Sequence, residues 1–475
     1  MGTRTRARTA GRSSSPSFAK PPRHTPAAAH AGLALASAKT GDHVNILQLL
    51  QTVFHGPPSA EFNAQLDEPG YDPADRVVVK DGSEIVAHLR LARQAISLDG
   101  QALAVARFMD LATAEAYRGR GLATAMLAGG QRLAAQRGAL VGLVRTRAPQ
   151  LFARQGWALC GRHLFSAAAP RAILAELSAA KFAAAPEART ALPVMNVTAP
   201  LSVRPMRRID LPAIVRIYRE NAAGLPGCPL RSEEYWEWLL SRGSCDQIYI
   251  ATTLPEPSDL AAMANSIIGY AFVRQCRIVE MFATSGREDV CREILARVCA
   301  DASERDEWLV RCDLRPGHEV YNVLGEAGGE LTHCRELAGE VLMAKLLDPL
   351  AALRAAAPAL YRRTRLTPAI ARPTELGIEL LAGRPGARTG IVERYRLQVG
   401  QRTARVETGG PSRHSISLSQ ADLAPLLLGD GGAEDFFRSG KLTGNTPKAR
   451  QLAVAIFPPR QWWRPVLDDL TAFPL

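Results

Sequence analysis

The stretch FMDLATAEAYRGRGLATAML, residues 108–127, decides the fold of the N-terminal part of this chain. Its apolar first half predicts a strand that ends near Thr113. Its Ala- and Leu-rich second half predicts a helix over 121–136. A short glycine-containing turn separates the two, so the chain passes from strand to helix within a few residues.

The turn has the composition of a phosphate-binding loop. Gly119 and Gly121 let the backbone turn tightly and approach a ligand without a Cβ in the way. The unpaired N–H groups of a helix start favour an anion, and the helix dipole adds to this preference. Arg118 and Arg120 bring further positive charge. The turn therefore predicts a site for a diphosphate.

Other phosphate-binding motifs do not fit this turn. The dinucleotide fingerprint GxGxxG is absent, and no GK[ST] of a P-loop is present. The residues instead read Arg-x-x-Gly-x-Ala over 118–123. Short predicted strands at 33–37, 77–79, 85–91, 103–113 and 140–144, with a helix over 44–54, surround the turn. This pattern indicates an α/β fold with mixed strand directions.

With this motif, the chain resembles the GNAT superfamily of acetyl-coenzyme A-dependent N-acetyltransferases over about 33–166. The resemblance implies that the cosubstrate is acetyl-coenzyme A. It implies that the pyrophosphate binds at Arg118, Gly119, Arg120, Gly121, Leu122, Ala123 and Thr124. It also implies that the pantetheine arm runs along Leu111, Ala112 and Thr113, where a backbone N–H polarises the thioester. The amine then attacks directly, without an acyl-enzyme.

The order of units resembles the "enhanced intracellular survival" family of acetyltransferases, whose members acetylate aminoglycosides, polyamines or protein lysines as hexamers. The resemblance at the C-terminal end rests on LAPLLLG, AEDFFRSGKL and ARQLAVAIFPP. The expected fold is α/β (α+β), with tandem GNAT folds and a small sterol-carrier-like module. The expected units are a disordered basic tail at 1–31, a catalytic GNAT domain at 32–168, a linker at 169–200, a second GNAT-like domain at 201–350 and a sterol-carrier-like domain at 366–475.

The second unit departs from the cofactor motif. Its corresponding helix start reads TSGREDVCREILARV and places Glu288 and Asp289 where the first unit has its glycine turn. Carboxylates satisfy a helix dipole and repel a pyrophosphate. We therefore expect no cofactor site in this unit.

Two further departures affect the chemistry. Many GNAT enzymes use a Tyr to protonate the departing thiolate, and the matching position here is Phe152, which cannot donate a proton. Three alternatives remain for the departing thiolate. Another donor (His163 or a water) protonates it, it leaves without assistance, or turnover is impaired. In the resembling family the C-terminal carboxylate helps to deprotonate the amine. Here that group would belong to Leu475, where the family usually has Phe.

Composition and charge bear on nucleic-acid binding, membrane insertion and metal binding. Of the net charge of +12, half lies in 1–31, which contain six Lys and Arg and no Asp or Glu. Nucleic-acid binding is therefore not indicated. The tail is interpreted as a solvated extension, as the result of a start codon assigned too far upstream, or as a targeting peptide. No apolar run is long enough to span a membrane. Eight scattered cysteines without a CxxC pair predict a reducing, cytoplasmic location and no metal site.

Two functions from different classes follow from these features. The first is an N-acetyltransferase that acts on a primary amine as a homo-oligomer. The second is a low-activity protein that senses coenzyme A or binds a lipid through the sterol-carrier-like module, a possibility kept open by Phe152.

Overall fold

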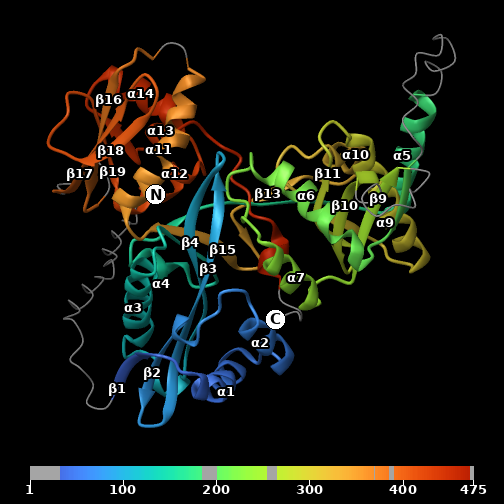
Figure 1. Cartoon of the computed structure of the whole chain (residues 1–475), viewed down its shortest axis with the longest axis horizontal. Helices are drawn as coiled ribbons and strands as arrows, with labels where there is room; N and C mark the ends of the chain where they lie inside the picture. Colours follow the sequence, from blue (N-terminus) through green and yellow to red (C-terminus); the bar gives the residue numbers. More distant parts are fainter. Residues whose placement is uncertain (1–32, 185–200, 254–264, 368–369, 384–389, 471–475) are drawn as a thin grey trace, which may run out of the picture.

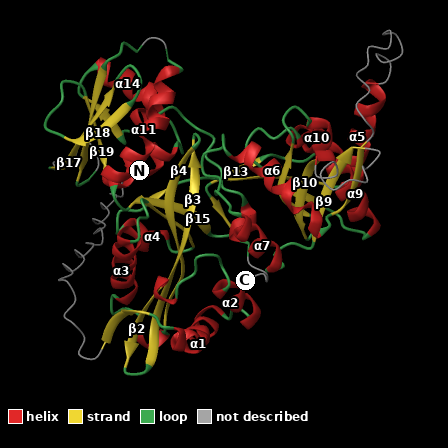
Figure 2. Cartoon of the chain, viewed as in Figure 1, coloured by secondary structure: helices red, strands yellow, loops and turns green. Residues whose placement is uncertain are grey.

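The computed structural model describes residues 33–184, 201–253, 265–367, 370–383 and 390–470. Within them the chain forms three β-sheets, each flanked by helices (Figures 1 and 2). The predicted α/β class with mixed sheets is confirmed. The basic tail at 1–31 and Leu475 lie outside the described residues.

The first sheet has the order β1-β2-β3-β4-β5-β15-β14, with β6 paired to β15. Its strands are β1 (Leu33–Ser37), β2 (Arg76–Asp81), β3 (Glu84–Leu98), β4 (Gln101–Thr113), β5 (Val141–Thr146), β6 (Ala158–Leu159), β14 (Glu336–Leu337) and β15 (Glu340–Leu346). Its helices are α1 (His43–Phe54), α2 (Ser59–Leu66), α3 (Leu122–Gln136) and α4 (Pro149–Ala153). Val77 and Val79 pack with the core on the α3 side, whereas Val78 packs with α1 and α2. Both faces of the sheet are therefore covered.

The second sheet has the order β13-β7-β12-β11-β10-β9-β8. Its strands are β7 (His163–Ala168), β8 (Leu201–Pro205), β9 (Gln247–Thr253), β10 (Ile267–Arg274), β11 (Arg277–Ala283), β12 (Val310–Cys312) and β13 (Thr332–Cys334). Its helices are α5 (Pro170–Ala184), α6 (Leu211–Ala222), α7 (Glu233–Ser241), α9 (Glu288–Glu304) and α10 (Val320–Glu326).

The first two sheets exchange strands. β7 follows the first sheet in sequence but pairs with β12 and β13 of the second. In return β15 follows the second sheet but pairs with β5 over Val141–Thr146. Sequence periodicity does not predict that β7 and β15 pair with strands of the other sheet. Each sheet is completed by a strand from the other half of the chain, so the two units depend on each other for folding.

The third sheet has the order β18-β17-β16-β19-β20. Its strands are β16 (Thr374–Leu381), β17 (Ile391–Val399), β18 (Ala404–Thr408), β19 (Ser415–Ser419) and β20 (Leu442–Gly444). Its helices are α11 (Pro349–Arg365), α12 (Gln420–Leu428), α13 (Ala433–Arg438) and α14 (Pro447–Ile456). Asp99 in the β3–β4 turn joins this unit to the first by ion pairs to Arg363 and Arg460.

The segment 458–470 then runs back between the first and second units (Figure 1). Trp462 packs with the core shared by the first and third sheets, and its neighbour Trp463 packs with the second. Near the end of the segment lies Asp469, whose carboxylate is 2.6 Å from Arg145 Nε. Asp469 also pairs with Arg107 at 3.6 Å and with Arg464 at 3.1 Å.

Replacing Asp469 with Asn tests this anchor. Burial alone would raise the pKa of Asp469, but Arg464, Arg145 and Arg107 outweigh it and hold the pKa below its usual range. The stabilisation is therefore present above the unfolded pKa of about 3.9 and is lost as the pH falls below it. We expect Asp469→Asn to cost about 2 kcal/mol at pH 7, the loss typical of hydrogen bonds to charged groups.

Thermal unfolding at pH 7 and at pH 3 measures this loss. The deficit of Asp469→Asn should shrink at the lower pH. Glu233→Gln is the matched control, because Glu233 pairs with Arg219 at 3.5 Å with both side chains more than 60% exposed. Such surface pairs contribute at most about 1 kcal/mol. Equal losses in the two variants would contradict the anchoring role.

Candidate coenzyme A and acceptor site

Strand β4 has a free edge where the predicted pantetheine residues lie. It pairs with β3 along its whole length but with β5 only at Val105, Ala106 and Arg107. Beyond Arg107 the two parallel strands diverge. Leu111, Ala112 and Thr113 therefore have a strand partner on the β3 side alone, within the described part of the chain. Their other edge is open to main-chain hydrogen bonds from an extended ligand.

A β-bulge interrupts β4 at Asp110. Against β3, the register passes from Arg90–Met109 to His88–Ala112, so β4 carries one extra residue. Asp110 has a φ of +53°, which is uncommon for a residue other than glycine. Bulges re-aim side chains and often lie beside active sites.

The predicted diphosphate turn has the expected backbone. Gly119 has a φ of +75° and Gly121 a φ of +79°, and α3 begins directly after Gly121. A Cβ built on either glycine would meet no atom within 4 Å, so the turn faces open space. No side chain caps the helix. The N–H groups of Leu122, Ala123 and Thr124 have no acceptor among the described residues.

The two arginines lie on the rim of this turn. Arg118 Nε donates to the carbonyl of Thr113 at 3.4 Å. The Arg120 guanidinium lies over the ring of Tyr117, 4.8 Å from its centre. Both arginines are exposed, whereas the Leu122 side chain is buried in the core on the α3 side. Leu122 is thus placed to offer a ligand its backbone alone.

Phe152 lies in the core rather than at the free strand edge. Its ring is 3% exposed and meets Trp157 edge-to-face, with 5.5 Å between ring centres. Burial, with a contribution from Arg145, lowers the pKa of His163 to about 4. His163 is therefore unprotonated at neutral pH and is not poised as the acid that replaces the missing Tyr.

The bulge is held from the α1 and α2 side by a chain of buried polar groups. His88 Nδ1 bonds the carbonyl of Asp110 at 2.9 Å, and its Nε2 lies 3.1 Å from Arg76. Arg76 also donates to Gln65 and Tyr71. Burial, then the charge of Arg76, lowers the pKa of His88 well below its usual value. His88 is therefore neutral, with Nδ1–H as donor and Nε2 as acceptor.

The carboxylate of Asp110 is a candidate functional group that the sequence analysis did not identify. Its Oδ2 is buried and has no hydrogen-bond partner among the described residues. Its charge is close enough to Arg76 to raise the pKa of that guanidinium, although burial, the larger effect, lowers it. A buried unpaired carboxylate oxygen is rare in native structures and points to a missing donor. The available signal was a lone Asp within the apolar run FMDLAT.

The second unit repeats the arrangement with a different helix start. β11 and β12 are parallel and pair only at Arg277 and Ile278, and α9 follows β11 as α3 follows β4. Asp289 lies in the first turn of α9 and forms an ion pair with Arg287 at 2.8 Å. The hydrogen bond from Arg287 lowers the pKa of Asp289. A fixed negative charge thus occupies the position that the first unit leaves to an anion.

A titration with coenzyme A tests this difference. We expect calorimetry to saturate at one coenzyme A per chain, because the α9 start repels a diphosphate. A stoichiometry of two would show that the second unit also binds the cofactor.

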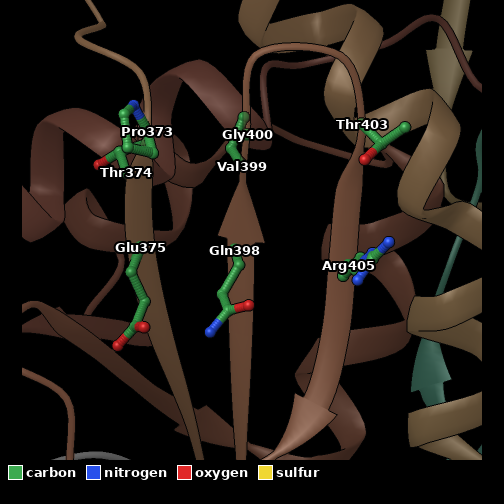
Figure 3. Close-up of a pocket in the computed structure, with 8 residues that line it drawn as sticks. All are labelled: Pro373, Thr374, Glu375, Gln398, Val399, Gly400, Thr403 and Arg405. Atoms are coloured by element: carbon green, nitrogen blue, oxygen red, sulfur yellow. The ribbon is translucent and has the colours of Figure 1, made fainter.

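Two open hollows lie away from the glycine turn. One, of about 550 Å³, lies in the third unit. It is lined by Glu375, Gln398 and Arg405, which come from three neighbouring strands (Figure 3). It is on the polar face of that sheet, not between the sheet and its helices. The other, of about 510 Å³, extends from Trp308 to Asp469. It thus borders the residue that pairs with Arg107 and Arg145 where β4 and β5 diverge.

Comparisons with known proteins agree with this geometry. Residues 35–160 match the family model described as "Acetyltransferase (GNAT) domain". The chain therefore contains a GNAT acetyltransferase domain, and its enzyme class is that of the N-acetyltransferases. No curated protein matches the chain in sequence. No described helix is long and apolar enough to cross a membrane.

Solved structures share the fold over most of the chain. A GCN5-related N-acetyltransferase from Anabaena variabilis has a TM-score of 0.66 at 15% identity, covering 91% of this chain and 99% of that one. One from Kribbella flavida gives 0.65 at 18% identity, covering 91% and 97%. Eis1 from Mycobacterium abscessus gives 0.60 at 14% identity, covering 91% and 99%.

Proposed function

We propose that the protein transfers the acetyl group of acetyl-coenzyme A to a primary amine by direct attack in a ternary complex. The observation that carries this proposal is the free edge of β4, which leads past the bulge into a glycine turn with unpaired N–H groups. That edge is suited to the pantetheine arm, and the turn to the pyrophosphate. Acetyl-coenzyme A is thus a substrate that the residues present can hold.

The acceptor is expected on the α1 and α2 side of the bulge. There the Asp110 carboxylate would accept a hydrogen bond from the substrate ammonium and then take up its proton. The amine nitrogen forms a bond to the thioester carbon and gives up its second proton to water, and the bond from that carbon to sulfur breaks. The sulfur leaves as thiolate and is protonated by water, because neither Phe152 nor neutral His163 supplies a proton. The proposed substrates are aminoglycosides, polyamines or lysine side chains.

The alternative is a protein that binds coenzyme A with little turnover, with a sterol-carrier-like module at 366–475 that holds a lipid. The buried Phe152 favours it, because the usual acid is missing. Adding a panel of primary amines to enzyme and acetyl-coenzyme A separates the two. Amine-dependent thiol release supports the transferase. Tight cofactor binding without release, whatever the amine, supports the sensor.

The role of the Leu475 carboxylate stays a prediction, as do the cytoplasmic location and a homo-oligomer such as a hexamer. The described chain stops at Leu470, next to the Asp469 anchor. Deleting 473–475 should lower kcat strongly and leave coenzyme A affinity and the melting temperature nearly unchanged. A truncated protein with full turnover would leave Leu475 without a catalytic part.

A further inference from the structure

The second unit contains a cluster of metal-binding side chains at the position that corresponds to the cofactor site of the first. β11 and β12 are adjacent parallel strands, and ligands of α/β sheets bind at the carboxyl ends of such strands. Cys291 lies on α9, which follows β11. His318 and Glu319 follow β12 and directly precede α10.

The three side chains converge. The Cys291 sulfur, a His318 ring nitrogen and a Glu319 carboxylate oxygen all lie within 4.8 Å of one another. His318 Nδ1 is 3.4 Å from Glu319 Oε2. The Cys291 residue and the His318 side chain are each 3% exposed, and the Glu319 side chain is 15% exposed. The cluster is therefore shielded from solvent except on the Glu319 side.

The orientation of His318 suits a metal ligand. The Val320 N–H points at Nδ1 from 3.4 Å, so Nδ1 carries a lone pair in the neutral ring. The backbone of Met281 on β11 is among the groups that interact with the ring. A metal-binding His usually has its other nitrogen held by a backbone carbonyl. The Val320 contact is long for a hydrogen bond, and a cation bound between Nδ1 and the Glu319 carboxylate would take its place at the ring lone pair.

We propose that Cys291, His318 and Glu319 bind one Zn²⁺ ion, with water as the fourth ligand. A thiolate and a carboxylate balance the charge of the ion, and a sulfur–nitrogen set favours zinc over magnesium or calcium. Of the neighbouring charges, Arg315 opposes a cation and Asp289 favours one. The ion would tie α9 to the segment before α10. It would close the second unit where the first binds its cofactor, independently of acetyl transfer.

Cobalt is the probe that tests this site. Full-length protein stripped with a chelator is titrated with Co²⁺, whose thiolate bond gives a charge-transfer absorption band. We expect one Co²⁺ per chain, with this band and the strong visible absorption of four-coordinate cobalt. Adding Zn²⁺ should remove the band and the visible absorption. A wild-type protein that shows no thiolate band would overturn the proposal without any variant.

Paired cysteine variants identify the ligand. Cys291→Ala should abolish the band and weaken Co²⁺ binding at least about 10-fold, since even losing a partner of a metal ligand costs about 10–100-fold. Cys299→Ala is the matched control, because Cys299 is also buried on α9 but is not part of the cluster. His318→Gln should likewise weaken binding. A band that survives Cys291→Ala, or disappears in Cys299→Ala alone, would contradict the assignment.

Discussion

Gly121→Glu should raise the dissociation constant of coenzyme A at least about 100-fold while the protein stays folded. Gly121 precedes α3 with a φ of +79°, and its Cβ position faces open space. A glutamate there would place a carboxylate beside the N–H groups of Leu122, Ala123 and Thr124. It would compete with the pyrophosphate for the positive helix end and repel its charge. Calorimetry with coenzyme A measures the loss.

Gly138→Glu is the matched control. Gly138 follows the other end of α3, has a φ of +84°, is exposed and has no atom within 4 Å of its Cβ position. Both substitutions therefore carry the same charge and the same backbone strain of about 1–2 kcal/mol. The 15 residues of α3 keep them about 22 Å apart. Similar affinity in the two variants would show that the pyrophosphate does not bind at the Gly121 turn.

Asp110→Asn should lower kcat/KM for the amine about 100-fold or more and leave coenzyme A affinity unchanged. The substitution keeps the size of the side chain and tolerates the positive φ of the bulge. It removes the charge that would attract an ammonium and the group that would take up its proton, and such proton transfer contributes about 10²–10⁴-fold. Steady-state kinetics with a varied amine concentration measures the effect.

Asp67→Asn controls for the loss of one negative charge. Asp67 is exposed at the end of α2, on the side of the sheet where the acceptor is expected. We expect its kcat/KM to stay within about twofold of wild type. Full activity of Asp110→Asn would mean that its buried oxygen has no part in catalysis. Loss of both activity and coenzyme A affinity would indicate a damaged fold instead.

Local sequence predicted the glycine turn before α3 well, because about twenty consecutive residues contain the strand end, both glycines and the start of α3. The same holds for the second unit, where Asp289 lies in the first turn of α9 as expected. The role of Leu122 needed the structure, since only packing shows that its side chain faces the core.

Features that join distant segments could not be predicted in this way. β7 and β15 each carry an ordinary strand pattern, and nothing local says which sheet they complete. The bulge at Asp110 depends on His88 and Arg76, which come from two other strands. The Asp469 anchor likewise depends on arginines more than 300 residues earlier in the chain.

Product analysis after a single reaction tests the central claim most directly. The enzyme is incubated with acetyl-coenzyme A and one polyamine, and both free thiol and acetylated amine are quantified by mass spectrometry. Direct transfer predicts one acetylated amine for each thiol released, and no acetylated protein when the amine is left out. Thiol release without acetylated amine, or an acetyl group that stays on the protein, would contradict direct transfer from acetyl-coenzyme A to the amine.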